Sequence, residues 1–276
     1  MVFDPSLSCV PSSQAPRPYI TAVLAMSADG KIADAKRSAA RFPSAADKAH
    51  LERQVASADA TLFGASTLRA YHTTLSVSSP GLLAQRQQQD KPKQPIQIVC
   101  SATGNLDSQW PFFQQPIPRW LIATPEGLQY WKDGLDRQTS SLERSKLESK
   151  PYTDQKLYPD QQLFEHVLIA ERPFRWPKLM QMLYTGTSSL SAKTSRRPVK
   201  QLLVMGGGEL VASLLADDLI DELYLTICPL LIGGKTAPTP VGGLGFTLPR
   251  TPRLSLKSSR VEGDEVFLHY LVDRTI

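Results

Sequence analysis

The sequence predicts an α/β fold with a mostly parallel central sheet, flanked by helices and ending in an antiparallel hairpin. Short apolar runs typical of buried strands alternate with helix-like segments over most of the 276 residues. The last two predicted strands, 254–260 and 265–272, are separated only by Glu262-Gly263-Asp264, which is a hairpin pattern. Parallel neighbours need a helical crossover, whereas antiparallel neighbours need only a turn. The two kinds of connection therefore predict the two parts of the sheet.

The individual elements follow from local patterns. The segment 19–26 is rich in β-formers and predicts the first strand. Ser44 begins a predicted helix that ends near residue 57, because Ser44-Ala45-Ala46-Asp47 resembles a capping box. Further helices are predicted at 128–135, 178–184 and 209–216. Further strands are predicted at 60–63, 96–100, 120–123, 167–170, 202–205 and 221–228.

One domain is predicted from 19 to 276, after a disordered lead-in over 1–18. The Gln-rich segment 76–95 is predicted as an exposed loop. The stretches 136–162 and 186–197 are polar and carry little core material, so they are predicted as insertions or loops within the domain.

The chain is organised around the segment 200–216. An apolar run at 202–205 leads directly into Gly206-Gly207-Gly208, and a helix with Leu210 on its apolar side follows. Such a junction gathers free backbone N–H groups and the positive end of a helix dipole, which suits a phosphate. A tight turn without any ligand explains the glycines equally well. The pattern is neither a full dinucleotide fingerprint nor a P-loop.

Three predicted turns share one location. They begin at Ser27, Gly64 and Gly206, each directly after a predicted strand. Ligands of parallel α/β sheets bind at the carboxyl ends of the strands. The three turns together therefore predict a common site.

Composition limits the partners and the compartment. The net charge is +5, but the basic residues are scattered without interleaved aromatics, so no nucleic-acid partner is expected. No apolar run is long enough to span a bilayer, and no membrane partner is expected. Cys9, Cys100 and Cys228 are odd in number and widely spaced, which indicates reduced thiols and a cytoplasmic location. The dispersed histidines His50, His166 and His269 suggest no metal site.

Taken together, the motifs resemble the RibD C-terminal domain family of riboflavin-biosynthesis reductases. The resemblance rests on Ser27-Ala28-Asp29-Gly30-Lys31-Ile32-Ala33, on Gly64-Ala65-Ser66-Thr67-Leu68-Arg69-Ala70, on the Gly206-Gly207-Gly208 turn, and on 219–234. It implies a dihydrofolate-reductase-like fold and a reductase of the 5-amino-6-(5-phosphoribosylamino)uracil type. It further implies NADPH as the cofactor, a heterocyclic small molecule as the substrate, and commonly a homodimer.

The resemblance also implies the site residues. The expected cofactor-binding residues are Gly64, Thr67, Met205, Gly206, Gly207, Gly208, Glu209 and Leu210. The expected substrate-binding residues are Ser27, Asp29, Gly30, Tyr71 and His72. No protein nucleophile is assigned, because hydride transfer requires orientation and exclusion of water rather than covalent catalysis.

Structural alternatives exist for several of these residues. Asp29 can cap a turn, and Thr67 can cap a helix. Tyr71 can stack on a heterocycle or pack in the core, and a loop histidine such as His72 is more often a surface residue than a proton donor. Glu209 favours the helix dipole by itself and is expected to point away from a phosphate.

Several positions depart from the family pattern. Tyr71-His72-Thr73 stands where the family often has Asp-Asp-Pro or Asp-Asn-Pro, and Met205 stands where an acidic residue commonly precedes the double glycine. The arginine that the family places soon after the next leucine has no match, because Leu75 is followed by Ser76-Val77-Ser78. A pteridine or dihydrofolate reductase, or a non-catalytic nucleotide-binding relative, therefore remains an alternative. The zinc pattern of the companion deaminase, H-x-E with P-C-x-x-C, does not occur, so zinc-dependent deamination is not expected. A cation for the 2′-phosphate of NADPH would come from Arg69, Lys193, Arg196 or Arg197.

Overall fold

A computed structural model describes residues 15–40, 44–147, 163–186 and 197–273. They form a nine-stranded sheet in the order β5-β4-β3-β2-β6-β1-β7-β9-β8. All pairs from β5 to β7 are parallel, whereas β7–β9 and β9–β8 are antiparallel. The strands are β1 (Tyr19–Ser27), β2 (Ala60–Gly64), β3 (Ile96–Cys100), β4 (Arg119–Ala123), β5 (His166–Ile169), β6 (Gln201–Val204), β7 (Glu222–Cys228), β8 (Arg253–Glu262) and β9 (Glu265–Asp273).

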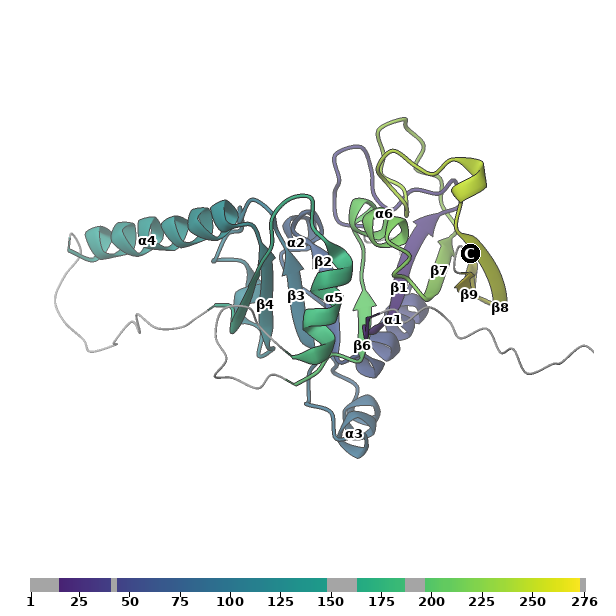
Figure 1. The fold of residues 1–276 in the computed structure, drawn as a ribbon, viewed down its shortest axis with the longest axis horizontal. Helices are drawn as coiled ribbons and strands as arrows, with labels where there is room; N and C mark the ends of the chain where they lie inside the picture. The colour runs from purple at the N-terminus through teal and green to yellow at the C-terminus, as the bar shows by residue number, and fades with distance from the viewer. Residues whose placement is uncertain (1–14, 41–43, 148–162, 187–196, 274–276) are drawn as a thin grey trace, which may run out of the picture.

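Helices cover the parallel part of the sheet on both faces. The helices are α1 (Ala45–Ser57), α2 (Ala65–Tyr71), α3 (Pro80–Gln88), α4 (Pro125–Leu147), α5 (Trp176–Thr185) and α6 (Gly208–Ala216), with short 3₁₀ turns η1 (Pro111–Gln114) and η2 (Leu248–Arg250). Helices α5 and α6 pack on the face that carries Leu62 and Ile98. On the other face, α1 packs over Val23 and Leu203. Figure 1 shows these layers, with α4 extending away from one end of the sheet.

The predicted sheet is confirmed, including its antiparallel end. Every predicted strand is present within two residues of its expected bounds. Ser44 caps α1 as expected, because its side chain accepts hydrogen bonds from the N–H groups of Ala46 and Asp47. Strand β1 lies between the parallel strands β6 and β7. Strands β2 to β5 follow on the β6 side, whereas β9 and β8 follow on the β7 side.

The expectation of a loop over 76–95 was wrong, because this segment contains the helix α3. Pro80 occupies the first turn of α3, where its missing N–H costs nothing. Leu82 and Leu83 pack against the cluster under α1. Arg86 is 1% exposed and donates to the carbonyls of Ala56, Ala58 and Pro92. A Gln-rich helix therefore owes its position to two leucines and one buried guanidinium, which a composition argument does not detect.

The expectation for 128–135 and 136–162 was also partly wrong. Helix α4 begins at Pro125 and continues to Leu147, so 136–147 belongs to a helix rather than to an insertion loop. By its composition this stretch is rich in good helix formers such as Leu, Glu, Lys and Arg. Residues 148–162 and most of the predicted loop at 186–197 lie outside the described residues.

The expected lead-in is described from residue 15 onward. There Arg17 makes a bidentate ion pair with the buried Asp221, at 2.6 and 2.7 Å. Asp221 also accepts a hydrogen bond from the Ile20 N–H, so it joins the start of β1 to the start of β7. No helix among the described residues is both long and apolar enough to cross a membrane.

Candidate active site

The turn after β6 has a backbone that only glycine adopts easily. Gly206 and Gly207 have φ angles of +110° and +88°, and Gly207 is the N-cap of α6. The first N–H groups of α6 point out of its N-terminal end into this turn and have no intrahelical acceptor. An anion is stabilised at such a point by the N–H groups and by the helix dipole.

The turn after β2 lies directly beside this glycine turn. A Cβ at Gly207 would lie 3.8 Å from the Thr67 Oγ1 and 4.0 Å from the Gly64 N. A Cβ at Gly206 would lie 3.9 Å from the same Thr67 oxygen. Helix α2 begins immediately after Gly64, so two helix starts and one hydroxyl group surround the same small space. The structure thus brings together Gly64, Thr67, Gly206 and Gly207, which follow two different strands in the sequence, whereas Leu210 and Met205 pack against apolar clusters.

Gly208 and Glu209, at the start of α6, contact the loop that follows β7. A Cβ on Gly208 would lie only 2.3 Å from the Thr239 carbonyl oxygen, so the loop after β7 requires a glycine there. The Gly242 N–H donates to the Gly208 carbonyl at 3.0 Å. The Glu209 carboxylate lies close to the backbone at Gly242 and Gly243. This loop therefore packs on the start of α6.

The turn after β1 is held by Asp29. Its carboxylate accepts hydrogen bonds from the Ser27 hydroxyl at 2.6 Å, the Ile232 N–H at 3.0 Å and the Gly233 N–H at 2.6 Å. The hydrogen bond from Ser27, followed by those from the backbone, lowers the pKa of Asp29 to about 2. Gly30 completes the turn with a φ of +79°. The ionised Asp29 therefore joins this turn to the loop after β7.

Tyr71 and His72 lie at the far end of α2 from Gly64, about 10 Å along the helix axis. The Tyr71 hydroxyl donates to the Ala40 carbonyl at 2.9 Å. His72 ends the helix in the left-handed conformation and stacks on Trp110 with ring centroids 5.1 Å apart. Both side chains have structural partners there, and neither is brought to the glycine turn.

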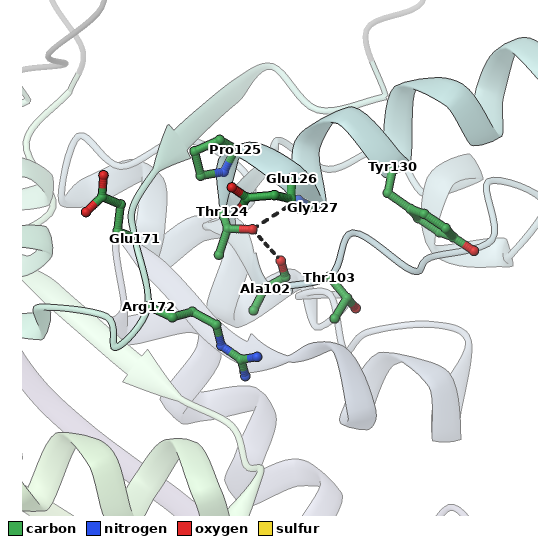
Figure 2. Close-up of a pocket in the computed structure, with 9 residues that line it drawn as sticks. All are labelled: Ala102, Thr103, Thr124, Pro125, Glu126, Gly127, Tyr130, Glu171 and Arg172. Atoms are coloured by element: carbon green, nitrogen blue, oxygen red, sulfur yellow. Dashed lines mark hydrogen bonds between the residues drawn. The ribbon is translucent and has the colours of Figure 1, made fainter.

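A pocket of about 650 Å³ extends the site beyond β2, at the carboxyl ends of β3, β4 and β5. The Thr124 hydroxyl donates to the Ala102 carbonyl at 2.8 Å and accepts from the Gly127 N–H at 3.0 Å, which fixes the start of α4 (Figure 2). A Cβ on Gly127 would lie 2.2 Å from the Ala102 oxygen, so the wall requires glycine. The pocket is lined by Ala102, Thr103, Thr124, Pro125, Glu126, Gly127, Tyr130, Glu171 and Arg172.

The charges of this pocket are mixed. Among the described residues that line it, Arg172 is the one cation, beside Glu126 and Glu171. Figure 2 shows the Glu171 carboxylate turned away from the Arg172 guanidinium. Outside the pocket, Arg69 of α2 donates to the Asn105 carbonyl at 3.1 Å, so it lies beside the loop after β3.

Of the four cations that the sequence offered for a 2′-phosphate, the structure describes two. Arg69 lies at the carboxyl end of the sheet, whereas Arg197 donates to the Asp90 carbonyl and precedes β6 at the opposite end. Lys193 and Arg196 lie outside the described residues. Sequence reasoning missed Arg172, although Glu171-Arg172 directly follows a predicted strand and Thr124-Pro125-Glu126-Gly127 is a typical helix start.

The site therefore runs along one edge of the sheet, from the pocket after β3–β5, past the two glycine turns, to the Asp29 turn after β1. Residues 18–268 match the RibD C-terminal domain. The chain belongs to the RibD C-terminal domain family. The resemblance predicted from the sequence motifs is thereby confirmed, and the match covers nearly the whole domain predicted from 19 onward.

Named relatives are reductases of riboflavin synthesis. The chain is 26% identical over 246 residues to the 2,5-diamino-6-ribosylamino-4(3H)-pyrimidinone 5′-phosphate reductase of Archaeoglobus fulgidus, covering 89% of this chain and 92% of the relative. It is 24% identical to the reductase of the same name from Aquifex aeolicus, covering 93% and 97%. Against the riboflavin biosynthesis protein RibD of Actinobacillus pleuropneumoniae it is 26% identical, but covers only 58% of that longer protein.

Solved structures share the fold. A pyrimidine reductase-like protein from Corynebacterium diphtheriae superposes with a TM-score of 0.70 at 19% identity, covering 94% of this chain and 93% of the other. RibD of Acinetobacter baumannii gives 0.65 at 17% identity, covering 94% and 59%. Within the described ranges, no group of three or more His, Cys, Asp or Glu side chains is arranged to hold a metal ion.

Proposed function

We propose that this protein is an NADPH-dependent reductase that acts on a ribosylaminopyrimidine 5′-phosphate in riboflavin synthesis. The observation that carries the proposal is the contact between the turns after β2 and β6, within a chain whose family match spans residues 18–268. Relatives of nearly the same length carry the name of such a reductase. The assay below distinguishes the two candidate substrates, the 2,5-diaminopyrimidinone and the 5-aminouracil form of the ribosylamino 5′-phosphate.

The residues present fit a dinucleotide. Gly206, Gly207 and the first N–H groups of α6 would hold the pyrophosphate, with the Thr67 hydroxyl as a further hydrogen-bond donor. Gly64 leaves the space beside them open, since the nearest neighbour of a Cβ there is the Ser66 hydroxyl at 3.7 Å. When bound, NADPH supplies the hydride. The chain's own contribution is to orient cofactor and substrate and to exclude water.

The pocket after β3–β5 would receive the adenosine end. Arg172 lines this pocket, and Arg69 of α2 lies beside the loop after β3. We expect Arg172→Met to weaken NADPH binding about tenfold or more and NADH binding much less, because only NADPH carries the 2′-phosphate. Calorimetric titration with both cofactors measures the difference. Arg197→Met is the matched control at the opposite end of the sheet, and equal weakening of both cofactors by Arg172→Met would remove this assignment.

The turn after β1 would meet the substrate. Ser27, Asp29 and Gly30 shape this turn, and Lys31 beside them is half-buried with its Nζ 3.5 Å from the Ala237 carbonyl. A lysine at this place offers a charge to a substrate phosphate, which the usual arginine after Leu75 does not supply here. Tyr71 and His72 stay predicted substrate residues, beside their contacts with the Ala40 carbonyl and Trp110.

We also infer a homodimer and a cytoplasmic location. Both follow from the family.

The direct test is NADPH oxidation by the purified protein, measured by absorbance. The panel contains both ribosylaminopyrimidine 5′-phosphates, dihydrofolate and a dihydropterin. Turnover of a pyrimidine phosphate alone supports the proposal, and preference for the pterin or folate would replace it with the pteridine reductase alternative. NADPH binding without any turnover would favour a non-catalytic nucleotide-binding protein.

A further inference from the structure

The loop after β7, residues 229–243 and here called the bridging loop, contacts two separate parts of the candidate site. Its first half meets the turn after β1, and its second half meets the start of α6. Strands β1 and β7 are parallel, so the loops that follow them leave the sheet at the same edge, as Figure 1 shows. The bridging loop therefore connects the proposed substrate turn with the proposed pyrophosphate turn.

The contacts with the turn after β1 centre on Asp29. The Ile232 and Gly233 N–H groups donate to its carboxylate at 3.0 and 2.6 Å. Further along, the Ile32 N–H donates to the Pro238 carbonyl at 2.9 Å. Hydrogen bonds to an ionised carboxylate are about twice as strong as those between neutral groups. Asp29 therefore contributes a large share of what holds this half of the loop.

The second half of the bridging loop packs on the first turn of α6. The Gly242 N–H donates to the Gly208 carbonyl at 3.0 Å, and a Cβ on Gly208 would lie only 2.3 Å from the Thr239 carbonyl oxygen. The same turn is closed by the Val211 N–H, which donates to the Gly207 carbonyl at 3.0 Å. The loop therefore lies against the N–H groups that are proposed to hold the pyrophosphate.

The bridging loop has few other means of keeping its place. It contains no helix or strand, and Ala237 is its one buried residue. Leu231, its largest apolar side chain, is 79% exposed. A segment with few buried apolar contacts depends on its hydrogen bonds for its position. Loss of the hydrogen bonds at one end of the loop should therefore loosen the other end.

Asp29 itself lies away from the glycine turn. That turn lies beside Leu24, because a Cβ on Gly206 would be 3.8 Å from the Leu24 Cδ2. Strand β1 continues from Leu24 to Ser27, about 10 Å along the strand, before the turn that carries Asp29. The donors to the Asp29 carboxylate belong to its own turn or to the bridging loop. A structural influence of Asp29 on the glycine turn therefore passes through the loop.

We propose that Asp29 is a positioning residue that holds the bridging loop on the first turn of α6 and so couples the substrate turn to the cofactor turn. This inference rests on the proposed reductase function. A substrate that orders the turn after β1 then raises the affinity for the dinucleotide, and the dinucleotide raises the affinity for the substrate by the same factor.

The first experiment needs no ligand. Hydrogen–deuterium exchange of the full chain, resolved to single residues by mass spectrometry, compares the wild type with Asp29→Asn and Asp34→Asn. In Asp29→Asn the amides of Gly242 and Val211 should exchange faster, because loosening spreads along the loop to α6. Asp34→Asn is the matched control, since Asp34 is also exposed but accepts from the Ser38 N–H within its own turn. Wild-type exchange at Gly242 and Val211 in Asp29→Asn would refute the positioning role.

The second experiment measures NADPH binding by fluorescence titration. Asp29→Asn should weaken NADPH binding about fivefold or more, within the usual range of coupling between sites, and Asp34→Asn should leave it unchanged. A direct electrostatic role predicts the opposite sign, because removing a negative charge strengthens the binding of an anionic cofactor. Tighter or unchanged binding by Asp29→Asn would therefore overturn the proposal.

A substitution at the other end of the loop completes the test. Gly242→Val should push the loop away from α6, since even a Cβ there would lie 3.1 Å from the Glu209 Oε1 and 3.2 Å from the Glu209 N. If both substitutions act through the loop, the double variant should bind NADPH no more weakly than the weaker-binding single variant. Losses that multiply would show two independent effects and contradict the proposal. A wild type that binds no NADPH would refute the reductase function, whereas the exchange comparison would still decide the positioning role.

Discussion

The parallel and antiparallel parts of this sheet differ in what surrounds them. In β2 and β4, four of five residues are buried, because helices pack on both faces. In β8 no residue is buried, although the strand is twice as long. The parallel part gathers strand ends and helix starts at one edge, where the candidate site lies. In the described chain the antiparallel end adds no such helix starts, and the apolar side chains of β8 are exposed.

The largest expected effect contrasts one leucine from each part. Leu62→Ala should lower the free energy of unfolding by about 2–5 kcal/mol, because Leu62 is fully buried and its removal leaves a cavity. Leu256→Ala, measured at concentrations where the chain is monomeric, should change it by less than about 0.5 kcal/mol. Urea denaturation gives both values. Similar losses at the two positions would contradict the contrast in burial.

Two glycines with positive φ provide the next contrast. Gly207→Asp should weaken NADPH binding by about 100-fold or more, since it adds strain and a negative charge where the pyrophosphate is proposed to bind. Gly263→Asp makes the same change in the β8–β9 turn, where no atom lies within 4 Å of the added Cβ. Fluorescence titration compares the two variants. Equal loss in both would mean that strain alone explains the effect.

The third prediction concerns pH at the antiparallel end. Burial, together with the charge of Arg260, lowers the pKa of His50 from 6.5 to about 4. In the unfolded chain His50 is therefore protonated below about pH 6.5, whereas in the folded chain it is protonated only below about pH 4. Stability contributed by neutral His50 is lost as the pH falls through this window. In His50→Phe the melting temperature should decrease less between pH 7 and 5 than in the wild type, and an identical decrease would refute the role of His50.

The smallest effect is expected for an exposed ion pair of β8. Glu262 pairs with Arg260, and both side chains are 40% or more exposed. Glu262→Gln should therefore change the free energy of unfolding by less than about 0.5 kcal/mol. The buried pair of Arg17 with Asp221 is the counterpart, because removing one partner leaves an unpaired charge. Asp221→Asn should cost clearly more in the same denaturation experiment.

Much of this fold was predictable from the sequence because its determinants are local. Apolar runs predicted all nine strands, Glu262-Gly263-Asp264 predicted the hairpin, and Ser44 predicted the start of α1. The glycine turn at Gly206 and the motifs around Ser27 and Gly64 also indicated the family. Each of these features depends on residues within a few positions of one another.

Other features were decided only by tertiary structure, because they depend on contacts between distant segments. Helix α3 depends on Arg86 reaching the carbonyls at the end of α1, and the pocket depends on Arg172 lying beside Thr124. Asp29 is predicted to lie at the substrate, and only the structure shows that its carboxylate also accepts hydrogen bonds from the loop after β7. The apolar face shared by β8 and β9 is recognisable only once the register places Leu256 beside Tyr270. A single sequence contains the residues of such contacts but not their pairing.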